Sequence, residues 1–228
     1  MVPRARLAPA LLLVLALLLT TATDTRAEPP QFWLPASVAV KLAPAWSLVV
    51  QAEPRWDEGG DAQVDRLLFR PAVVWEPVRG LTLWGGYGYT EVTPKDAADD
   101  QLTWQQAVCA FEVGGWTLAP RVRVEERFVE RSAGVAWRLR GHIRAVRPLR
   151  RAAGWSFVTW HESFVPLNTV SGAQASGYSQ GRFFLGVQRR VSRHLTIEPG
   201  YLALFNHRRK PLANDWDHAI DVGVQVRF

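Results

Sequence analysis

The segment AIDVGVQVRF, residues 219–228, alternates strictly between two kinds of residue. One parity is apolar and the other is mostly polar: Ile220, Val222, Val224, Val226 and Phe228 against Asp221, Gly223, Gln225 and Arg227. A period of two predicts a β-strand with one apolar face. A strand in a soluble protein and a strand against lipid share this pattern, so the neighbour of the apolar face must be inferred from the rest of the chain.

The first 27 residues have the three parts of a secretory signal peptide. Arg4 and Arg6 precede an apolar run at 7–19, and Thr25-Arg26-Ala27 has the small-x-small pattern of a cleavage site. The run is shorter than the roughly 17 to 25 apolar residues of a membrane-spanning helix. We therefore expect cleavage after Ala27 and a single mature domain at 28–228.

The composition of the mature chain excludes several classes of function. Its 24 basic and 20 acidic residues give a mild positive excess without a basic stripe, so we expect no nucleic-acid partner. Cys109 is the single cysteine, which excludes an intramolecular disulfide and a cysteine-based metal site. The histidines lie in separate segments without metal-ligand spacing, so we expect no metal and no other cofactor.

Eleven mostly alternating segments follow one another from Phe32 onward. They cover 32–42, 46–57, 63–76, 81–92, 101–113, 116–128, 135–146, 155–166, 180–191, 194–206 and 217–228. These segments exceed the roughly five to six residues usual for strands, and they match the 9 to 11 residues with which a tilted strand crosses a bilayer. Short turns alternate with longer polar connections, as in outer-membrane barrels.

The tryptophans give a second indication. Eight of the eleven lie at or beside the ends of expected strands, where interfacial aromatic residues gather: Trp33, Trp46, Trp56, Trp75, Trp104, Trp116, Trp155 and Trp216. The sequence thus predicts an all-β protein, an antiparallel up-and-down transmembrane β-barrel of about 10–12 strands. Because such barrels have an even strand number in bacteria, we expect ten or twelve strands, with twelve favoured.

The alternative is a soluble periplasmic lipocalin-like binder, in which the apolar faces point inward. Alternation alone does not distinguish the two arrangements. A soluble barrel of eleven long strands would enclose a very large apolar cavity, which favours the membrane barrel.

Charged residues cluster on one parity of several strands, and in a membrane barrel this parity faces the lumen. The expected lumen network comprises Arg121, Arg123, Glu125, Arg127, Arg138, Arg140, Glu162, Arg182 and Glu198, with Glu53, Arg55, Arg66, Arg70, Arg144 and Arg190 also facing inward. Such charges persist inside a protein when they are paired. Two functions remain open: a structural barrel with a salt-bridged interior, or a narrow small-solute passage that prefers anions because of its arginines.

A hydrolytic alternative rests on TWHESF, residues 159–164. His161 and Ser163 are two residues apart and share a strand face, while Glu162 points to the other face. Lipid-hydrolysing barrels place such a pair on the lipid side near the rim. The sequence identifies no third member, so we assign no catalytic residue and do not expect an enzyme; an outer-membrane lipid hydrolase stays an alternative.

Several stretches also suggest a family. They are QLTWQQAVCAFEVGGWTLAPRVRVEERF (101–128), RLR (138–140), WHESF (160–164), QGRFFLG (180–186) and EPGYL (198–202). In their order and spacing they resemble the bacterial outer-membrane β-barrel family catalogued as domain of unknown function 2490, over about Trp33 to Phe228. The resemblance implies a barrel exported to the bacterial cell outer membrane and no assigned biochemical activity.

Phe228 fits the same interpretation. Outer-membrane barrels commonly end in an alternating strand with a terminal aromatic residue that the barrel-assembly machinery reads. We expect Phe228 to be this assembly signal, the apolar residues of 219–228 to face lipid, and outer-membrane lipid and the assembly machinery to be the partners.

Overall fold

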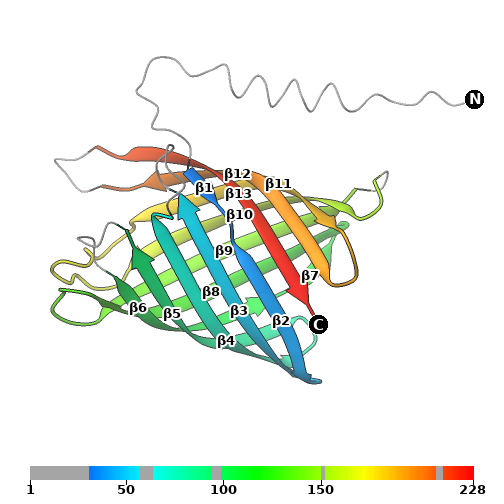
Figure 1. The fold of residues 1–228 in the computed structure, drawn as a ribbon, viewed down its shortest axis with the longest axis horizontal. Coiled ribbons are helices and arrows are strands. Elements are labelled where there is room, and N and C mark those ends of the chain that lie inside the picture. Colours follow the sequence, from blue (N-terminus) through cyan, green and yellow to red (C-terminus); the bar gives the residue numbers. More distant parts are fainter. Residues whose placement is uncertain (1–30, 57–63, 94–98, 150–151, 209–212) are drawn as a thin grey trace, which may run out of the picture.

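The computed structural model describes residues 31–56, 64–93, 99–149, 152–208 and 213–228 (Figure 1). The predicted signal peptide therefore lies outside the described residues. The strands are β1 (Gln31–Trp33), β2 (Ala36–Ala43), β3 (Trp46–Trp56), β4 (Arg66–Val78), β5 (Leu81–Val92), β6 (Asp100–Cys109), β7 (Phe111–Val113), β8 (Trp116–Val129), β9 (Ala136–Pro148), β10 (Trp155–Pro166), β11 (Gln180–Arg190), β12 (Leu195–Asn206) and β13 (Asp215–Arg227). Over these ranges the chain forms no helix that is long and apolar enough to cross a membrane.

The strands close into one barrel, in which every strand except β7 pairs with a neighbour on each side; β7 pairs with β8 alone. β1 and β2 share one position in the wall, and β6 and β7 share another, so the wall has eleven positions. The predicted all-β barrel of about 10–12 strands is confirmed. The expectation of an even number is wrong.

The odd number has a geometric consequence at the closing seam. Eleven crossings leave the first and last strands running in the same direction, so β13 pairs in parallel with β1, through Phe32 and Ile220, and with β2, through Val38 and Val226. The other neighbouring strands in the described wall are antiparallel. The up-and-down description therefore holds except at this seam.

The expected strand 32–42 is divided at Leu34-Pro35. Proline has no backbone N–H, which interrupts regular pairing. The wall nevertheless stays continuous, because the Leu34 N–H donates to the Pro54 carbonyl (3.0 Å) and the Pro35 carbonyl accepts from the Val224 N–H (2.8 Å). The break separates β1 from β2 without opening the barrel.

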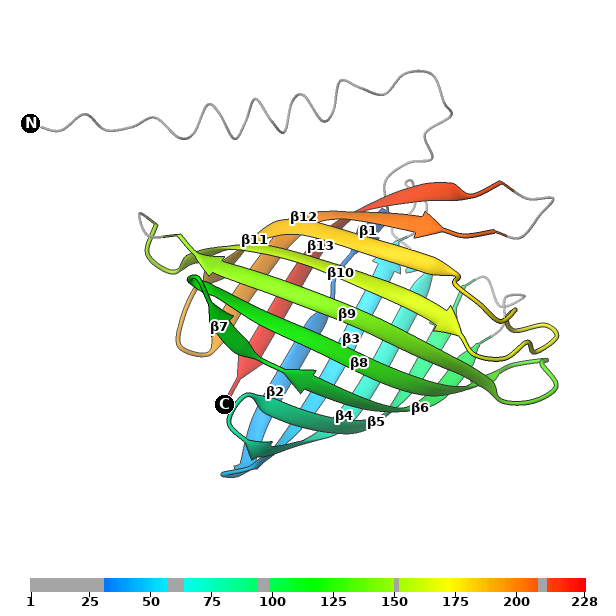
Figure 2. The same cartoon turned by 180° about the vertical axis from the view of Figure 1, so that it is seen from behind.

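The two rims of the barrel differ, as Figures 1 and 2 show. At the short-turn rim, two to six residues separate β2 from β3, β4 from β5, β7 from β8, β9 from β10 and β11 from β12; at the long-loop rim, six to thirteen residues separate β3 from β4, β5 from β6, β8 from β9, β10 from β11 and β12 from β13. β1 begins at the long-loop rim, whereas Phe228 lies at the short-turn rim, where its N–H donates to the Ala39 carbonyl (2.9 Å). The predicted alternation of short and long connections is therefore present.

Apolar side chains cover the outside of the barrel, and charged side chains lie inside. Exposed apolar residues on the outer face include Val38, Leu48, Phe69, Val73, Leu83, Val122, Ile143, Phe183, Leu185, Tyr201 and Ile220. In contrast, Arg55, Arg123, Glu125, Arg140 and Glu162 are buried. In the opening segment, Ile220 is exposed and Asp221 is buried. This polarity is the reverse of the arrangement that the soluble lipocalin-like alternative requires.

Aromatic pairs lie near both rims. Trp46 and Trp75 stack near the short-turn rim with ring centroids 5.9 Å apart, and Phe205 and Trp216 pair at 5.1 Å near the long-loop rim. Phe32 and Trp56 form another pair near the long-loop rim at 5.4 Å. Paired amphipathic rings at two levels are typical of barrels that cross a bilayer.

Two tryptophans expected among these rim residues lie in the interior instead. Trp33 and Trp104 are 3% and 0% exposed. Trp104 shares the inward parity of the buried Leu102 and Gln106, and Gly86 opposite it on β5 leaves room for the ring, since a Cβ atom there would come within 2.6 Å of Trp104 Cζ2. A position at a strand end therefore did not reveal which way the ring points.

Candidate functional site in the barrel interior

An ion-pair network occupies the middle of the interior, and Arg140 on β9 lies at its centre. Its Nη1 donates to Glu125 Oε1 (2.7 Å) and its Nη2 donates to Glu162 Oε1 (2.8 Å). The two carboxylates, on β8 and β10, are buried. Because a buried charge is costly without a partner, one arginine that serves two carboxylates ties three neighbouring strands together.

Further arginines complete the surroundings of both carboxylates. Arg138 Nε donates to Glu125 Oε2 (2.7 Å), and Arg123 Nη1 lies 3.6 Å from Glu125 Oε1. Arg121 pairs with Glu162. Each of the two carboxylates therefore has more than one cationic partner.

Smaller clusters surround this centre. Arg127 Nη2 donates to Asp100 Oδ2 (2.6 Å), and Arg144 Nη1 donates to Glu198 Oε1 (2.7 Å). Glu53 pairs with Arg55 and lies 3.3 Å from Arg70. The structure thus places eight of the nine sequence-predicted network residues in ion pairs inside the barrel.

Arg182 is the ninth, and no carboxylate of the described chain lies within ion-pair distance of it. Its Nε donates to Gln180 Oε1 (2.8 Å), and its guanidinium carbon lies 4.4 Å from the Phe164 ring centroid. Arg190, also expected inside, is exposed at the short-turn rim. Asp100 was not among the expected network residues, because it precedes the expected strand 101–113.

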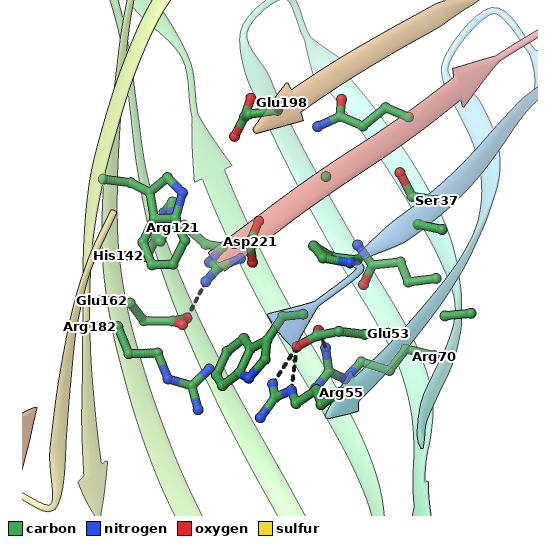
Figure 3. Close-up of a pocket in the computed structure, with 18 of the residues that line it drawn as sticks. Ser37, Glu53, Arg55, Arg70, Arg121, His142, Glu162, Arg182, Glu198 and Asp221 are labelled. Atoms are coloured by element: carbon green, nitrogen blue, oxygen red, sulfur yellow. Dashed lines mark hydrogen bonds and ion pairs between the residues drawn. The ribbon is translucent and has the colours of Figure 1, made fainter. Parts of the chain in front are cut away.

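Two cavities lie along one side of the interior. The inner cavity, of about 220 Å³, extends toward the short-turn rim between β2, β3 and β13, where Ser37, Gln51 and Gln225 line it. Its wall contains six arginines and four carboxylates. Figure 3 shows Glu162 and Arg182 on one side of it and Glu53 and Arg55 on the other.

The outer cavity, of about 380 Å³, lies at the long-loop rim. Gln180, Asn206 and Asp217 contribute to its wall together with four arginines: Arg55, Arg66, Arg182 and Arg208. In both cavities, the arginines therefore outnumber the carboxylates.

Three residues line both cavities: Trp33, Arg55 and Arg182. The guanidinium carbon of Arg55 lies 3.6 Å from the Trp33 ring centroid, and that of Arg182 lies 5.0 Å from it. An indole ring attracts guanidinium groups through its electron-rich face. We call this group the Trp33 constriction, because it stands between the two cavities.

His161 and Ser163 lie on the outer face of β10, opposite in direction to Glu162. His161 Nε2 and Ser163 Oγ are 2.9 Å apart. The structure therefore brings the two residues of the hydrolytic alternative into hydrogen-bond contact. Among the described residues, no group of three or more His, Cys, Asp and Glu side chains is arranged to hold a metal ion.

A closed β-barrel with an apolar outside and a charged inside defines the class of this protein, and such a fold is compatible with an outer-membrane location. The chain belongs to the family described as "Protein of unknown function (DUF2490)", whose model matches residues 30–215. The resemblance seen in the sequence is thereby confirmed. An uncharacterized protein of Methylorubrum extorquens is 29% identical over 231 residues, and the match covers 96% of this chain and 97% of that protein.

Proposed function

We propose that this protein is an outer-membrane β-barrel that provides a narrow, anion-preferring passage for small solutes. The observation that carries the proposal is the pair of arginine-rich cavities, which approach the two rims and share the Trp33 constriction. The signal peptide at 1–27 would deliver the chain to the envelope.

The outer surface supports the membrane location. Exposed apolar side chains follow the wall between aromatic pairs near each rim. The barrel also pairs its backbone groups between neighbouring strands, as a spanning structure must in hydrocarbon. Outer-membrane lipid is therefore the partner that this surface fits.

The position of Phe228 supports its expected role as an assembly signal. The ring of Phe228 is exposed and stacks on His194 with centroids 5.4 Å apart at the short-turn rim. An exposed aromatic ring after an alternating strand supports the expectation that the barrel-assembly machinery reads this segment.

The arginines favour anions over cations in the passage. Most guanidinium groups along it are balanced by carboxylates, so we expect a modest preference. Arg182 at the Trp33 constriction is not paired with a carboxylate of the described chain in this way. A glutamine oxygen and two aromatic rings surround its guanidinium group instead. A guanidinium group in this position suits a passing carboxylate or phosphate.

The other side of the interior has a structural role in this proposal. Between β6 and β10, the buried rings of Trp104 and Phe164 and the Glu125–Arg140–Glu162 network fill the space beside the passage. This packing supports the salt-bridged interior expected from the sequence. In this proposal, the packed side of the lumen holds the strands in register, and the side with the two cavities provides the passage.

Conductance in a planar lipid bilayer tests the proposal. We expect Trp33→Ala to raise the single-channel conductance in KCl several-fold, because it removes the ring that separates the cavities. Arg182→Gln should shift the reversal potential in a KCl gradient toward lower anion preference. The matched control is Trp84→Ala, an interior tryptophan that packs on Trp104 and lines neither cavity.

A lack of conductance would contradict the proposed passage. If folded wild-type protein and folded Trp33→Ala both fail to conduct, the barrel is closed and its interior is structural. Folding is checked independently, because a folded barrel migrates differently in detergent gels before and after boiling.

A further inference from the structure

The outer face of β10 carries an ordered serine–histidine pair. His161 Nδ1 lies 3.0 Å from the Arg182 backbone carbonyl on β11. A carbonyl oxygen only accepts hydrogen bonds, so in the neutral ring Nδ1 carries the hydrogen and Nε2 is the acceptor. That acceptor lies 2.9 Å from Ser163 Oγ, which places the serine hydroxyl proton toward the imidazole.

The orientation of the imidazole is fixed from a second direction. The His161 ring lies against Phe183, its cross-strand neighbour, with centroids 4.3 Å apart. The backbone carbonyl and this ring contact supply an orienting third group, which the sequence alone does not reveal. A base held by a third group beside a nucleophile is the general arrangement of serine hydrolases.

The wall beside Ser163 is open on the β9 side. The cross-strand neighbours of Ser163 are Gly141 on β9 and Gly181 on β11, so neither neighbour adds a side chain of its own beside the hydroxyl. A Cβ atom at Gly141 would meet nothing within 4 Å. This gap leaves room for a planar ester group to approach Ser163 along the outer surface.

A hydrogen-bond donor lies over the other glycine. A Cβ atom at Gly181 would overlap the Tyr178 hydroxyl and would come within 3.6 Å of His161 Cε1. No residue in the described part of the chain accepts a hydrogen bond from this hydroxyl. A phenol is protonated at neutral pH and can donate, and desolvation raises the pKa of the Tyr178 phenol further. It is thus placed to stabilise negative charge on an ester carbonyl oxygen.

We propose that Ser163, His161 and Tyr178 form a lipid-facing site that hydrolyses the acyl esters of membrane lipids. Ser163 Oγ attacks the carbonyl carbon while its proton passes to His161 Nε2. The ester C–O bond breaks, and the proton goes to the departing alcohol. Water then attacks the acyl-serine, His161 takes a proton from it and returns it to Ser163 Oγ, and a fatty acid leaves.

The depth of the site fits this class of substrate. Ser163 precedes the end of β10 at Pro166 by three residues, about 10 Å at the rise of an extended strand. The exposed ring of Trp137 lies on the neighbouring strand near the same rim. Interfacial tryptophans mark the level of the lipid headgroups, and acyl esters lie directly below that level. The apolar side chains of Ile143 and Phe183, which flank His161, would contact the acyl chain.

Fatty-acid release tests the site. The purified full-length mature protein is incubated with phosphatidylethanolamine–phosphatidylglycerol vesicles and, separately, with vesicles that contain lipopolysaccharide. Free fatty acid is measured by mass spectrometry. We expect release from at least one kind of vesicle, and the comparison identifies which lipid supplies the ester. Ser163→Ala and His161→Phe should each lower the rate at least about 100-fold.

The matched control is Thr159→Val, which removes an outward hydroxyl from the same strand face and should leave the rate unchanged. Tyr178→Phe should lower the rate without preventing acylation. Absence of release from both kinds of vesicle, or full activity in Ser163→Ala, would overturn the proposal.

A second measurement applies if Ser163→Ala does not fold. The wild-type protein is treated with a long-chain alkyl fluorophosphonate, and its peptides are analysed for the adduct. Modification of Ser163 supports the proposal, whereas an unmodified Ser163 overturns it. This result is independent of the passage, because Trp33→Ala should leave fatty-acid release unchanged and Ser163→Ala should leave conductance unchanged.

Discussion

Replacement of Arg140 by methionine should destabilise the barrel strongly. The change removes the only guanidinium that pairs with both Glu125 and Glu162 among the described residues. Breaking a buried ion pair costs about 3–5 kcal/mol, because a charge stays behind in the interior. Here other arginines still contact both carboxylates, which favours the lower end of that range. A loss of about 3 kcal/mol lowers the folding equilibrium constant more than 100-fold.

Urea unfolding of the barrel in detergent micelles measures this loss as a change in the free energy of unfolding. The matched control is Lys41→Met, which removes an ion pair at the protein surface. Lys41 Nζ lies 3.8 Å from Glu76 Oε2, and both side chains are well exposed, so the cost should stay within about 1 kcal/mol. If Arg140→Met is no more destabilising than Lys41→Met, the ion pairs of Arg140 do not hold the strands together.

Three further changes probe the wall. Gly86→Val should destabilise the barrel by about 1–3 kcal/mol through overpacking. Gly85→Val on the same strand should cost little, since a Cβ atom there meets nothing within 4 Å. Urea unfolding measures the difference between the two variants. Cysteines at Val38 and Val226 should form an oxidant-dependent cross-link across the parallel seam, seen as a gel-mobility shift, and a wall with an even strand number would not bring them together. Phe228→Ser should reduce the folded fraction in isolated outer membranes, and unchanged insertion would show that the ring is not needed for assembly.

The strand positions were largely predictable from the sequence. The expected segments 81–92 and 155–166 coincide with β5 and β10, and most of the others differ from the structure by one to three residues at an end. The alternation is visible in the sequence because the outer and inner faces of each strand have different surroundings along its whole length. The charged parity of β8 and β9 grouped the charged side chains on one face, but the length and number of the strands were needed to predict that this face lies inside.

The strand number was harder to predict. Eleven segments were visible, but the general preference for even numbers argued against that count. A parallel seam depends on how the two ends of the wall meet, and local alternation carries no information about pairing between distant strands. The break at Leu34-Pro35 was not predictable either, because the hydrogen bonds that bridge it involve residues of β3 and β13.

The interior site could be predicted only in part. The sequence identified the arginines and glutamates, since charge and parity define them. It could not identify the Trp33 constriction, because an inward tryptophan between two guanidinium groups depends on contacts among β1, β3 and β11. The sequence also could not identify the orienting partner of His161, because this partner is a backbone carbonyl, and every residue has one.

The parallel seam also determines where the two ends of the wall emerge. Because the chain crosses the wall an odd number of times, Gln31 at the start of β1 and Arg227 at the end of β13 lie at opposite rims. In the proposed membrane these rims face different compartments. One folded molecule labelled at Gln31 and at Arg227 would therefore carry two reporters on opposite sides of the membrane, without an insertion into any loop and without residues added after Phe228.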